Sequence, residues 1–120
     1  MKWWNDYRRF REQFREAMDQ RFFPIEHLDS LIWSGVARLW VSENAAIVAR
    51  LERFPSGILY VEGLIAAGDL DGIKALIPHA ENWGREHGAL FGKIESRAGW
   101  AREMKQDGYA PFQVALIKEL

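Results

Sequence analysis

The stretch AAGDLDGIKAL, Ala66 to Leu76, has the pattern of a buried strand that passes through a tight turn into a helix. A helix N-terminus offers free backbone N–H groups and the positive end of the helix dipole, so it is a common place for a phosphate. This turn, however, carries Asp69 and Asp71. Asp69 is a natural N-cap, and each carboxylate should stabilise the helix by about 1 kcal/mol. Like charges about 4 Å apart cost on the order of 4 kcal/mol at a surface-like dielectric, so the same carboxylates would repel a bound phosphate.

A second residue that could take part in catalysis is Glu62, the only charged side chain in the apolar run Ile58 to Ala67. A carboxylate in such surroundings is a reasonable general base for proton transfer. The structural alternative is an ion pair with an arginine at the edge of the core, either Arg50 or Arg38. The sequence leaves both interpretations open.

Other kinds of site find little support in the sequence. The chain has no cysteine, which excludes a thiolate nucleophile and a disulfide framework. The spacing of His27, His79 and His87 does not match a metal-ligand motif, and we interpret them as near-surface helix residues. No serine lies in a nucleophile-elbow pattern. We therefore predict no metal site.

Length and charge narrow the class of protein. At 120 residues and 48% hydrophobic composition, residues 1–120 should form one domain with a real core. The net charge of -1 argues against binding to nucleic acid or to anionic lipid. The longest apolar runs fall far short of the roughly 20 residues that span a bilayer, and the start of the chain lacks the apolar core of a secretion signal. We expect a cytoplasmic protein.

The periodicity predicts two helices ahead of any strand. Apolar residues at intervals of three and four indicate an amphipathic helix over Asn5 to Asp19. A second helix, Ile25 to Ser34, follows Pro24 and ends at Gly35. Alternating residues then predict a hairpin of two strands, Val36 to Ser42 and Ala45 to Phe54.

The second half of the chain should begin with a central strand, Ile58 to Ala67, buried on both faces. The helix that Asp69 caps should end near Gly88, with a kink at Lys74 to Pro78 because proline removes a backbone hydrogen bond. Three further elements are predicted: a short strand over Ala89 to Glu95, a helix over Arg97 to Gln106 and a closing strand over Tyr109 to Leu120.

This order of elements resembles the GNAT superfamily of acetyl-CoA-dependent N-acetyltransferases. The tail ESRAGWAREMKQDGYAPFQVALIKEL, with Gly108-Tyr109 before its last strand, is similar to the closing part of that family, and HAENWGREHGA is similar to its central helix. The resemblance covers Gly35 to Leu120 and extends to short GNAT-like proteins of phage and prophage genomes. It implies an α+β fold with a mixed, mainly antiparallel sheet flanked by helices, from which the family's first strand is missing.

The resemblance also implies a cofactor and site residues. The family's loop of arginine or glutamine and three glycines holds the CoA pyrophosphate, and here Gly72-Ile73 match its second glycine and apolar residue. Asp69, Leu70 and Lys74 depart from it, and Met104 stands where the family's acid tyrosine would lie. Acetyl-CoA, if bound, would contact Ile65, Ala66, Gly68, Gly72, Ile73 and Lys74.

Two functions follow from these observations. The departures favour a degenerate acetyltransferase-like module used for binding or assembly, such as a phage accessory or structural protein associated with a virion. The alternative is an active acetyl-CoA-dependent N-acetyltransferase with an atypical cofactor loop and Glu62 as its base. We also expect a protein partner or an oligomer through the aromatic N-terminal helices, which carry Trp3, Trp4 and Trp33.

Overall fold

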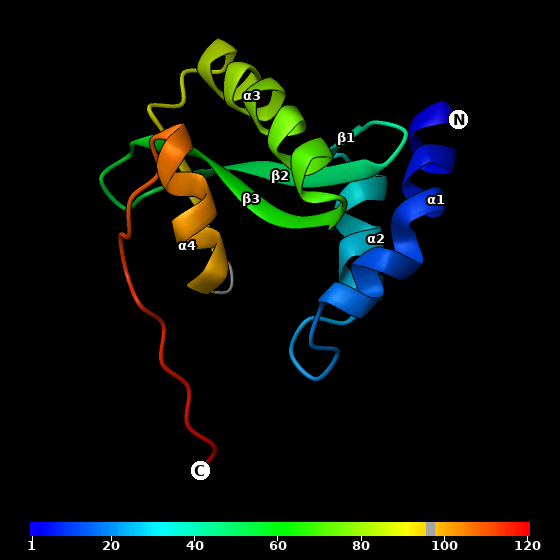
Figure 1. Ribbon diagram of the computed structural model, residues 1–120, viewed down its shortest axis with the longest axis horizontal. Helices are drawn as coiled ribbons and strands as arrows, with labels where there is room; N and C mark the ends of the chain where they lie inside the picture. The colour runs from blue at the N-terminus through cyan, green and yellow to red at the C-terminus, as the bar shows by residue number, and fades with distance from the viewer. Residues whose placement is uncertain (96–97) are drawn as a thin grey trace.

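A computed structural model of the chain describes residues 1–95 and 98–120, and shows a four-stranded sheet with helices on both faces (Figure 1). The strands β1 (Ala37–Val41), β2 (Ala45–Arg53) and β3 (Leu59–Gly68) form an antiparallel meander. The fourth strand, β4 (Phe91–Ile94), pairs in parallel with β3 at the end of the sheet. This is the mixed, mainly antiparallel α+β architecture that the sequence predicts, and no strand precedes the first helix.

The first face of the sheet is covered by α1 (Lys2–Ala17) and α2 (Ile25–Ser34). Helix α2 has the predicted bounds and ends at Gly35, whose φ of 79° suits a residue without a side chain. Helix α1 begins and ends a few residues earlier than predicted, so that Trp3 and Trp4 lie in its first turn. The two helices and the sheet enclose a core rich in aromatic side chains.

The second face is covered by α3 (Leu70–Glu86) and α4 (Ala98–Met104), which continues into a 3-10 turn, Lys105–Asp107. Helix α3 runs continuously through Pro78, and the kink expected there stays a prediction. The helix packs very closely on β3, since a Cβ added at Gly84 would lie 2.0 Å from a methyl group of Val61. The predicted start of α4 at Arg97 lies outside the described residues.

The prediction of a closing strand over Tyr109 to Leu120 is wrong. Residues 109–120 have no regular secondary structure, and the segment runs away from the sheet (Figure 1). Its alternation of apolar and polar residues is typical of a strand, but a strand needs a neighbour for its backbone hydrogen bonds. Apart from the Tyr109 N–H, which donates to the Met104 carbonyl oxygen, these residues have no backbone hydrogen bond and no neighbouring strand within the described chain.

None of the helices described in residues 1–95 and 98–120 is both long enough and apolar enough to cross a bilayer.

Candidate functional site

The site lies along β3, which is paired on its two edges to different extents. Towards β2 all but one of its residues have a partner, the exception being Leu64 at a bulge opposite Val48 and Ala49. Towards β4 the pairing covers only Tyr60 to Gly63. The second half of β3 therefore has an outer edge without a neighbouring strand in the described chain, and its backbone N–H and C=O groups can meet a ligand.

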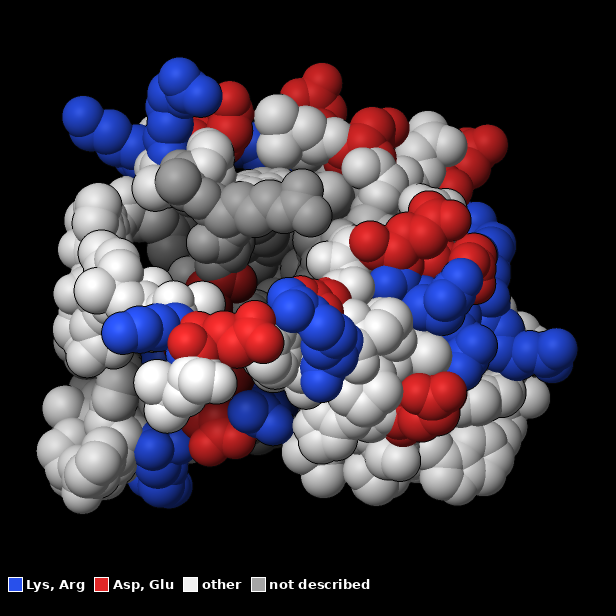
Figure 2. All heavy atoms as spheres, turned by 90° about the horizontal axis from the view of Figure 1, so that it is seen from below, with Lys and Arg blue, Asp and Glu red and all other residues white. Residues whose placement is uncertain are grey.

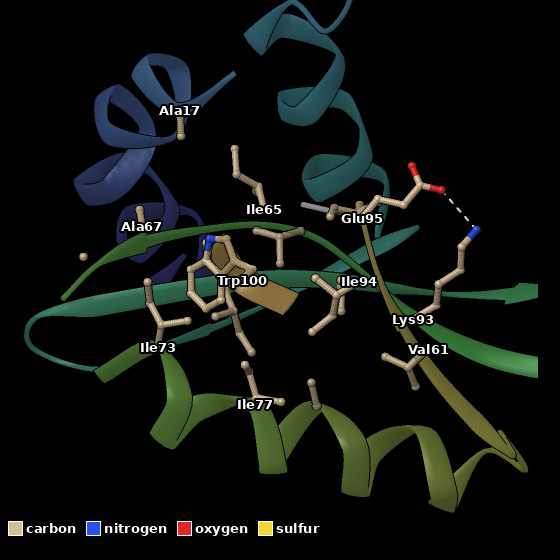
Figure 3. Close-up of a pocket in the computed structure, with 18 of the residues that line it drawn as sticks. Ala17, Val61, Ile65, Ala67, Ile73, Ile77, Lys93, Ile94, Glu95 and Trp100 are labelled. Carbon is tan, nitrogen blue, oxygen red and sulfur yellow. Dashed lines mark ion pairs between the residues drawn. The ribbon is translucent and has the colours of Figure 1, made fainter. Parts of the chain in front are cut away.

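A cleft of about 610 Å³ follows this open edge. Figure 3 shows its walls: Ile65 comes from β3, Ile73 and Ile77 from α3, and Trp100 from α4. The polar side chains at its margin are few, namely Gln13, Glu16, Glu81, Lys93, Glu95 and Tyr109. A mainly apolar cleft beside unpaired backbone groups suits a ligand with an apolar arm and amide groups.

Figure 2 shows a hollowed surface with lysine, arginine, aspartate and glutamate interspersed over the same face. Within this view neither sign of charge forms one continuous field. On this face of the described residues, the charges offer no broad basic surface to a polyanion.

Of the residues predicted to hold a cofactor, Ile65, Ala66, Gly68 and Ile73 line the cleft. Gly72 lies beside it in the first turn of α3, where an added Cβ would be 2.6 Å from Asp69 Oδ1 and 2.8 Å from the Ala45 methyl group. The fold thus brings most of the predicted cofactor-binding residues together at the cleft.

The N-terminus of α3 already carries a carboxylate. The Gly72 N–H donates to Asp69 Oδ1 over 2.6 Å, which confirms the predicted N-cap. Asp71 adds a second negative charge in the first turn. One helix N–H is thereby occupied, and the dipole is complemented by the protein's own anions.

Lys74 does not compensate for these charges. Its Nζ lies 3.4 Å from Asp107 Oδ2 and donates to the Glu103 carbonyl oxygen over 3.4 Å. The lysine therefore ties α3 to the end of α4. A phosphate at the helix terminus would have to compete with Asp107 for this cation.

Glu62 lies on the α1 side of the sheet, opposite to the face covered by α3. Arg50 Nη2 donates to Glu62 Oε1 over 3.2 Å, and the glutamate side chain is 14% exposed. Arg50 also lies 3.1 Å from Glu52 through its Nε atom. The ion pair expected as the structural alternative is thus present with Arg50, whereas Arg38 lies over the rings of Trp40 and Trp83.

The sequence alone missed Lys93, which is the cross-strand neighbour of Glu62 and lines the cleft. Its Nζ lies 3.1 Å from Glu95 Oε1, and the hydrogen bond to Glu95 raises the pKa of the lysine (Figure 3). The alternation in FGKIE could have placed Lys93 on one face of a strand, but the parallel pairing with β3 is needed to put it beside Glu62.

Tyr109, interpreted from sequence as a packing residue, lines the cleft. Its hydroxyl group donates to Glu81 Oε2 over 2.8 Å, and burial together with this hydrogen bond raises the pKa of the phenol. Met104, at the position where a tyrosine would be expected from the resemblance, is buried. Neither residue presents a free proton donor to the cleft.

The predicted aromatic surface is present on the N-terminal helices. The rings of Trp3 and Trp4 lie 5.8 and 5.0 Å from that of Trp33, and Trp33 is 58% exposed. A partner for this surface stays a prediction.

Comparison with known proteins identifies similar folds among solved structures but finds no similarity in sequence to a protein family or a curated protein. No protein-family model matches the chain, and no curated protein matches it in sequence. Solved structures do match over almost its whole length. A putative acetyl transferase from Pyrococcus furiosus superposes with a TM-score of 0.76 at 14% identity, covering 97% of this chain and 92% of that one.

Two further structures have the same fold. Glucosamine-6-phosphate N-acetyltransferase from Arabidopsis thaliana has a TM-score of 0.69 at 12% identity, with 96% and 92% of the two chains covered. A predicted acetyltransferase from Clostridium acetobutylicum, solved with acetyl-CoA, has a TM-score of 0.65 at 10% identity, with 85% and 76% covered. The chain therefore has the fold of the GNAT acyl-CoA N-acyltransferases.

Proposed function

We propose that this chain is an acetyltransferase-like module that serves binding or assembly and uses acetyl-CoA poorly or not at all. The observation that carries the proposal is the hydrogen bond between the Gly72 N–H and Asp69 Oδ1. It places a carboxylate at the helix terminus to which the resemblance assigns the CoA pyrophosphate. A like charge at about 4 Å costs on the order of 4 kcal/mol, which is close to a thousandfold in affinity.

The fit to CoA therefore differs between the two parts of the cofactor. The open edge of β3 and the apolar cleft suit the acyl and pantetheine arm. The α3 terminus does not suit the pyrophosphate, since Asp69 and Asp71 carry the wrong charge and Lys74 is held by Asp107. A ligand with an apolar arm and no diphosphate would meet only the favourable part.

The three positions that the sequence analysis considered for a general base or acid support the same conclusion. Glu62 is engaged by Arg50, and the Tyr109 hydroxyl is engaged by Glu81. Met104 supplies no acidic proton. A general base or acid must be free to exchange a proton with the substrate, and each of these positions is tied to another side chain or lacks the group.

An active acetyl-CoA-dependent N-acetyltransferase is the second candidate, and the cleft itself favours it. The solved structures that share the fold carry the name acetyltransferase, and one was solved with acetyl-CoA. In this reading Glu62 takes the proton of the acceptor amine after release from Arg50. Ile65, Ala66, Gly68, Gly72, Ile73 and Lys74 hold the cofactor.

Calorimetric titration distinguishes the two candidates. Acetyl-CoA and pantetheine, which lacks the nucleotide and diphosphate, are each titrated into the wild type and into Asp69→Asn. Asparagine keeps the N-cap but removes the charge. We expect no micromolar binding of acetyl-CoA to the wild type, a gain of up to about a thousandfold in Asp69→Asn, and no change in the binding of pantetheine.

Glu86→Gln is the matched control, because it removes the same charge from the other end of α3. It should leave acetyl-CoA binding unchanged. A micromolar dissociation constant for acetyl-CoA in the wild type, together with acetyl transfer to an amine, would overturn the binding proposal in favour of the enzyme. If Asp69→Asn binds no better than the wild type, charge repulsion at the helix terminus is not the cause of weak binding.

The partner in this proposal is a protein that covers the surface of Trp3, Trp4 and Trp33. Aromatic side chains are enriched in such contacts, and this cluster joins the start of α1 to the end of α2. A phage-type role, association with a virion and a cytoplasmic location stay predictions.

A further inference from the structure

The outer edge of β3 continues beyond the end of its pairing with β4. The last pair joins Gly63 to Ile94, whereas β3 runs on to Gly68. No loop backbone in the described residues makes a hydrogen bond with the stretch from Leu64 to Gly68. A row of backbone N–H and C=O groups without a neighbouring strand is a place where an extended chain can add.

The cleft beside this stretch is apolar on the face of the sheet that α3 and α4 cover. Ile73, Ile77 and Trp100 line it there, and the last two are only half-buried (Figure 3). Apolar side chains that face a cavity lack the contacts that a filled core provides. The apolar side chains of a ligand can supply these contacts on the α3 and α4 face.

The cleft is polar on the opposite face, which α1 covers. Helix α1 contributes Gln13 and the exposed Glu16 to the lining. Lys93 and Glu95 also line the cleft, and Figure 3 shows them on the side of the sheet away from Ile77. The ammonium group of Lys93 is engaged by Glu95 over 3.1 Å. On this face a ligand therefore meets the negative charge of Glu16.

The charges at the end of the stretch have the same sign. Strand β3 ends at Gly68, and Asp69 and Asp71 follow in the cap and the first turn of α3. The nearby cation, Lys74, lies 3.4 Å from Asp107 and is engaged by it. The carboxylates that oppose a diphosphate attract a positively charged group instead. The charge along the cleft therefore favours a cationic ligand.

We propose that the cleft binds an extended, basic peptide segment of a partner protein, which adds as a short strand to the outer edge of β3 at Leu64 to Gly68. Successive side chains of a strand point to opposite faces. Apolar residues at alternate positions of the peptide pack on Ile77 and Trp100, and the lysine or arginine residues between them face Glu16. This inference rests on the proposed binding function, since the peptide occupies the space that the pantetheine arm of a cofactor would take.

A basic peptide fits the strand edge, the apolar wall and the negative charge together. The open stretch from Leu64 to Gly68 has the length of an ordinary strand of about five residues. An aliphatic amine would meet the apolar wall and the charge, but it would leave the backbone groups of β3 unpaired. An acidic peptide would pair with the edge, but it would place like charges beside Glu16 and Asp69.

Titration of the full chain with two end-blocked peptides, VKVKV and VEVEV, tests the charge and the place of binding. VKVKV should bind with a dissociation constant on the order of 100 µM or below, and VEVEV should bind at least about tenfold more weakly. The difference should shrink as added salt screens the charges. Nuclear magnetic resonance should show shifts of the backbone amides from Ile65 to Gly68. Absence of VKVKV binding, equal binding of both peptides, or shifts confined to other residues would overturn the proposal.

Two N-methylated forms of VKVKV test whether the peptide binds as a strand. Only alternate residues of a strand exchange hydrogen bonds with a given neighbour, and an N-methyl group removes the donor. Methylation of the valines in one form and of the lysines in the other should therefore have unequal effects. One form should lose binding by at least about tenfold, and the other should stay close to the parent peptide. Equal affinities of the two forms would contradict strand addition.

Glu16→Lys tests the side chain that is assigned to the basic residues of the peptide. It should weaken the binding of VKVKV by about tenfold and strengthen that of VEVEV. Glu86→Lys is the matched control, because it makes the same charge change at an exposed residue of α3 that does not line the cleft. Circular dichroism verifies that both variants are folded. Equal effects of the two variants would show that overall charge, and not the cleft, selects the peptide.

Failure of this inference is distinguishable from failure of the binding function, because the peptide titrations contain no acetyl-CoA. If neither VKVKV nor acetyl-CoA binds, the binding function stands and its ligand is not a basic peptide. Pantetheine should compete with VKVKV for the cleft. Mass spectrometry of VKVKV incubated with the protein and acetyl-CoA should show no acetylation. An acetylated lysine would overturn both proposals, since the peptide would then lie at an acceptor site beside a bound cofactor.

Discussion

The two faces of the sheet are packed in different ways. Against α1 and α2 the buried cluster contains three aromatic side chains, Tyr7, Phe10 and Phe14, two of which have no exposed area. Against α3 the buried cluster has no aromatic member and consists of alanine, valine, isoleucine and leucine. The first face is filled by large side chains, and the cleft lies at the open edge of β3, between Ala17 of α1 and Ile73 and Ile77 of α3.

This difference separates stability from ligand binding. Burying large apolar side chains provides most of the favourable free energy of a small domain, so the α1 and α2 face should carry the larger share of stability. The residues between α3 and the open edge of β3 line a space instead of filling it. A change at the cleft should then affect a ligand more than it affects folding.

The largest expected effect is that of Phe14→Ala on the filled face. Phe14 is fully buried, and removal of such a side chain costs about 3–5 kcal/mol of unfolding free energy. Ile77→Ala, on the half-buried wall of the cleft, should cost no more than about 2 kcal/mol. Urea denaturation measures both. Equal losses would show that the two faces do not differ in the way described.

A smaller loss is expected where α3 approaches β3 most closely. In Gly84→Ala the new methyl group would lie 2.0 Å from a methyl group of Val61, so α3 must move and the protein should lose about 1–3 kcal/mol. Gly99→Ala on α4, where nothing lies within 4 Å, should be neutral or slightly stabilising. Addition of Val61→Ala should restore part of the stability of Gly84→Ala. Without that recovery, the contact with Val61 does not explain the requirement for glycine.

Local signals in the sequence were sufficient for most of the fold. Gly35 and Asp69 each mark a helix boundary that the structure confirms, because a left-handed residue and a capping carboxylate act within one turn of the chain. The central strand was recognisable because it is apolar on both faces. These features depend on neighbours that are close in sequence.

Features that depend on distant neighbours were not predictable in the same way. The partner of Glu62 required the register between β2 and β3, and the role of Tyr109 required α4 to lie beside α3. The tail at residues 110–120 has the right composition for a strand but no partner within the described chain. An alternating pattern indicates that a segment can form a strand, but the neighbouring strand with which it pairs is set by the tertiary or quaternary structure.

The smallest expected effect is a dependence of stability on pH that arises on the filled face. Arg11 donates to both carboxylate oxygens of Asp29 over 2.9 and 2.7 Å, and Tyr7 donates to it over 2.6 Å. The hydrogen bonds from Arg11 lower the pKa of Asp29 in the folded state. The carboxylate therefore contributes stability above its unfolded pKa of about 3.9, and this contribution is lost as the pH falls through the lower, folded pKa.

Asp29→Asn should be less stable than the wild type at pH 7 by about 1 kcal/mol, and the difference should shrink as the pH is lowered below about 4. Urea denaturation between pH 7 and pH 2 measures this convergence. In Tyr7→Phe the convergence should persist, because Arg11 is the main cause of the lowered pKa of Asp29. If the difference between the wild type and Asp29→Asn is the same at every pH, the ion pair between α1 and α2 does not stabilise the filled face, and that face depends on apolar packing alone.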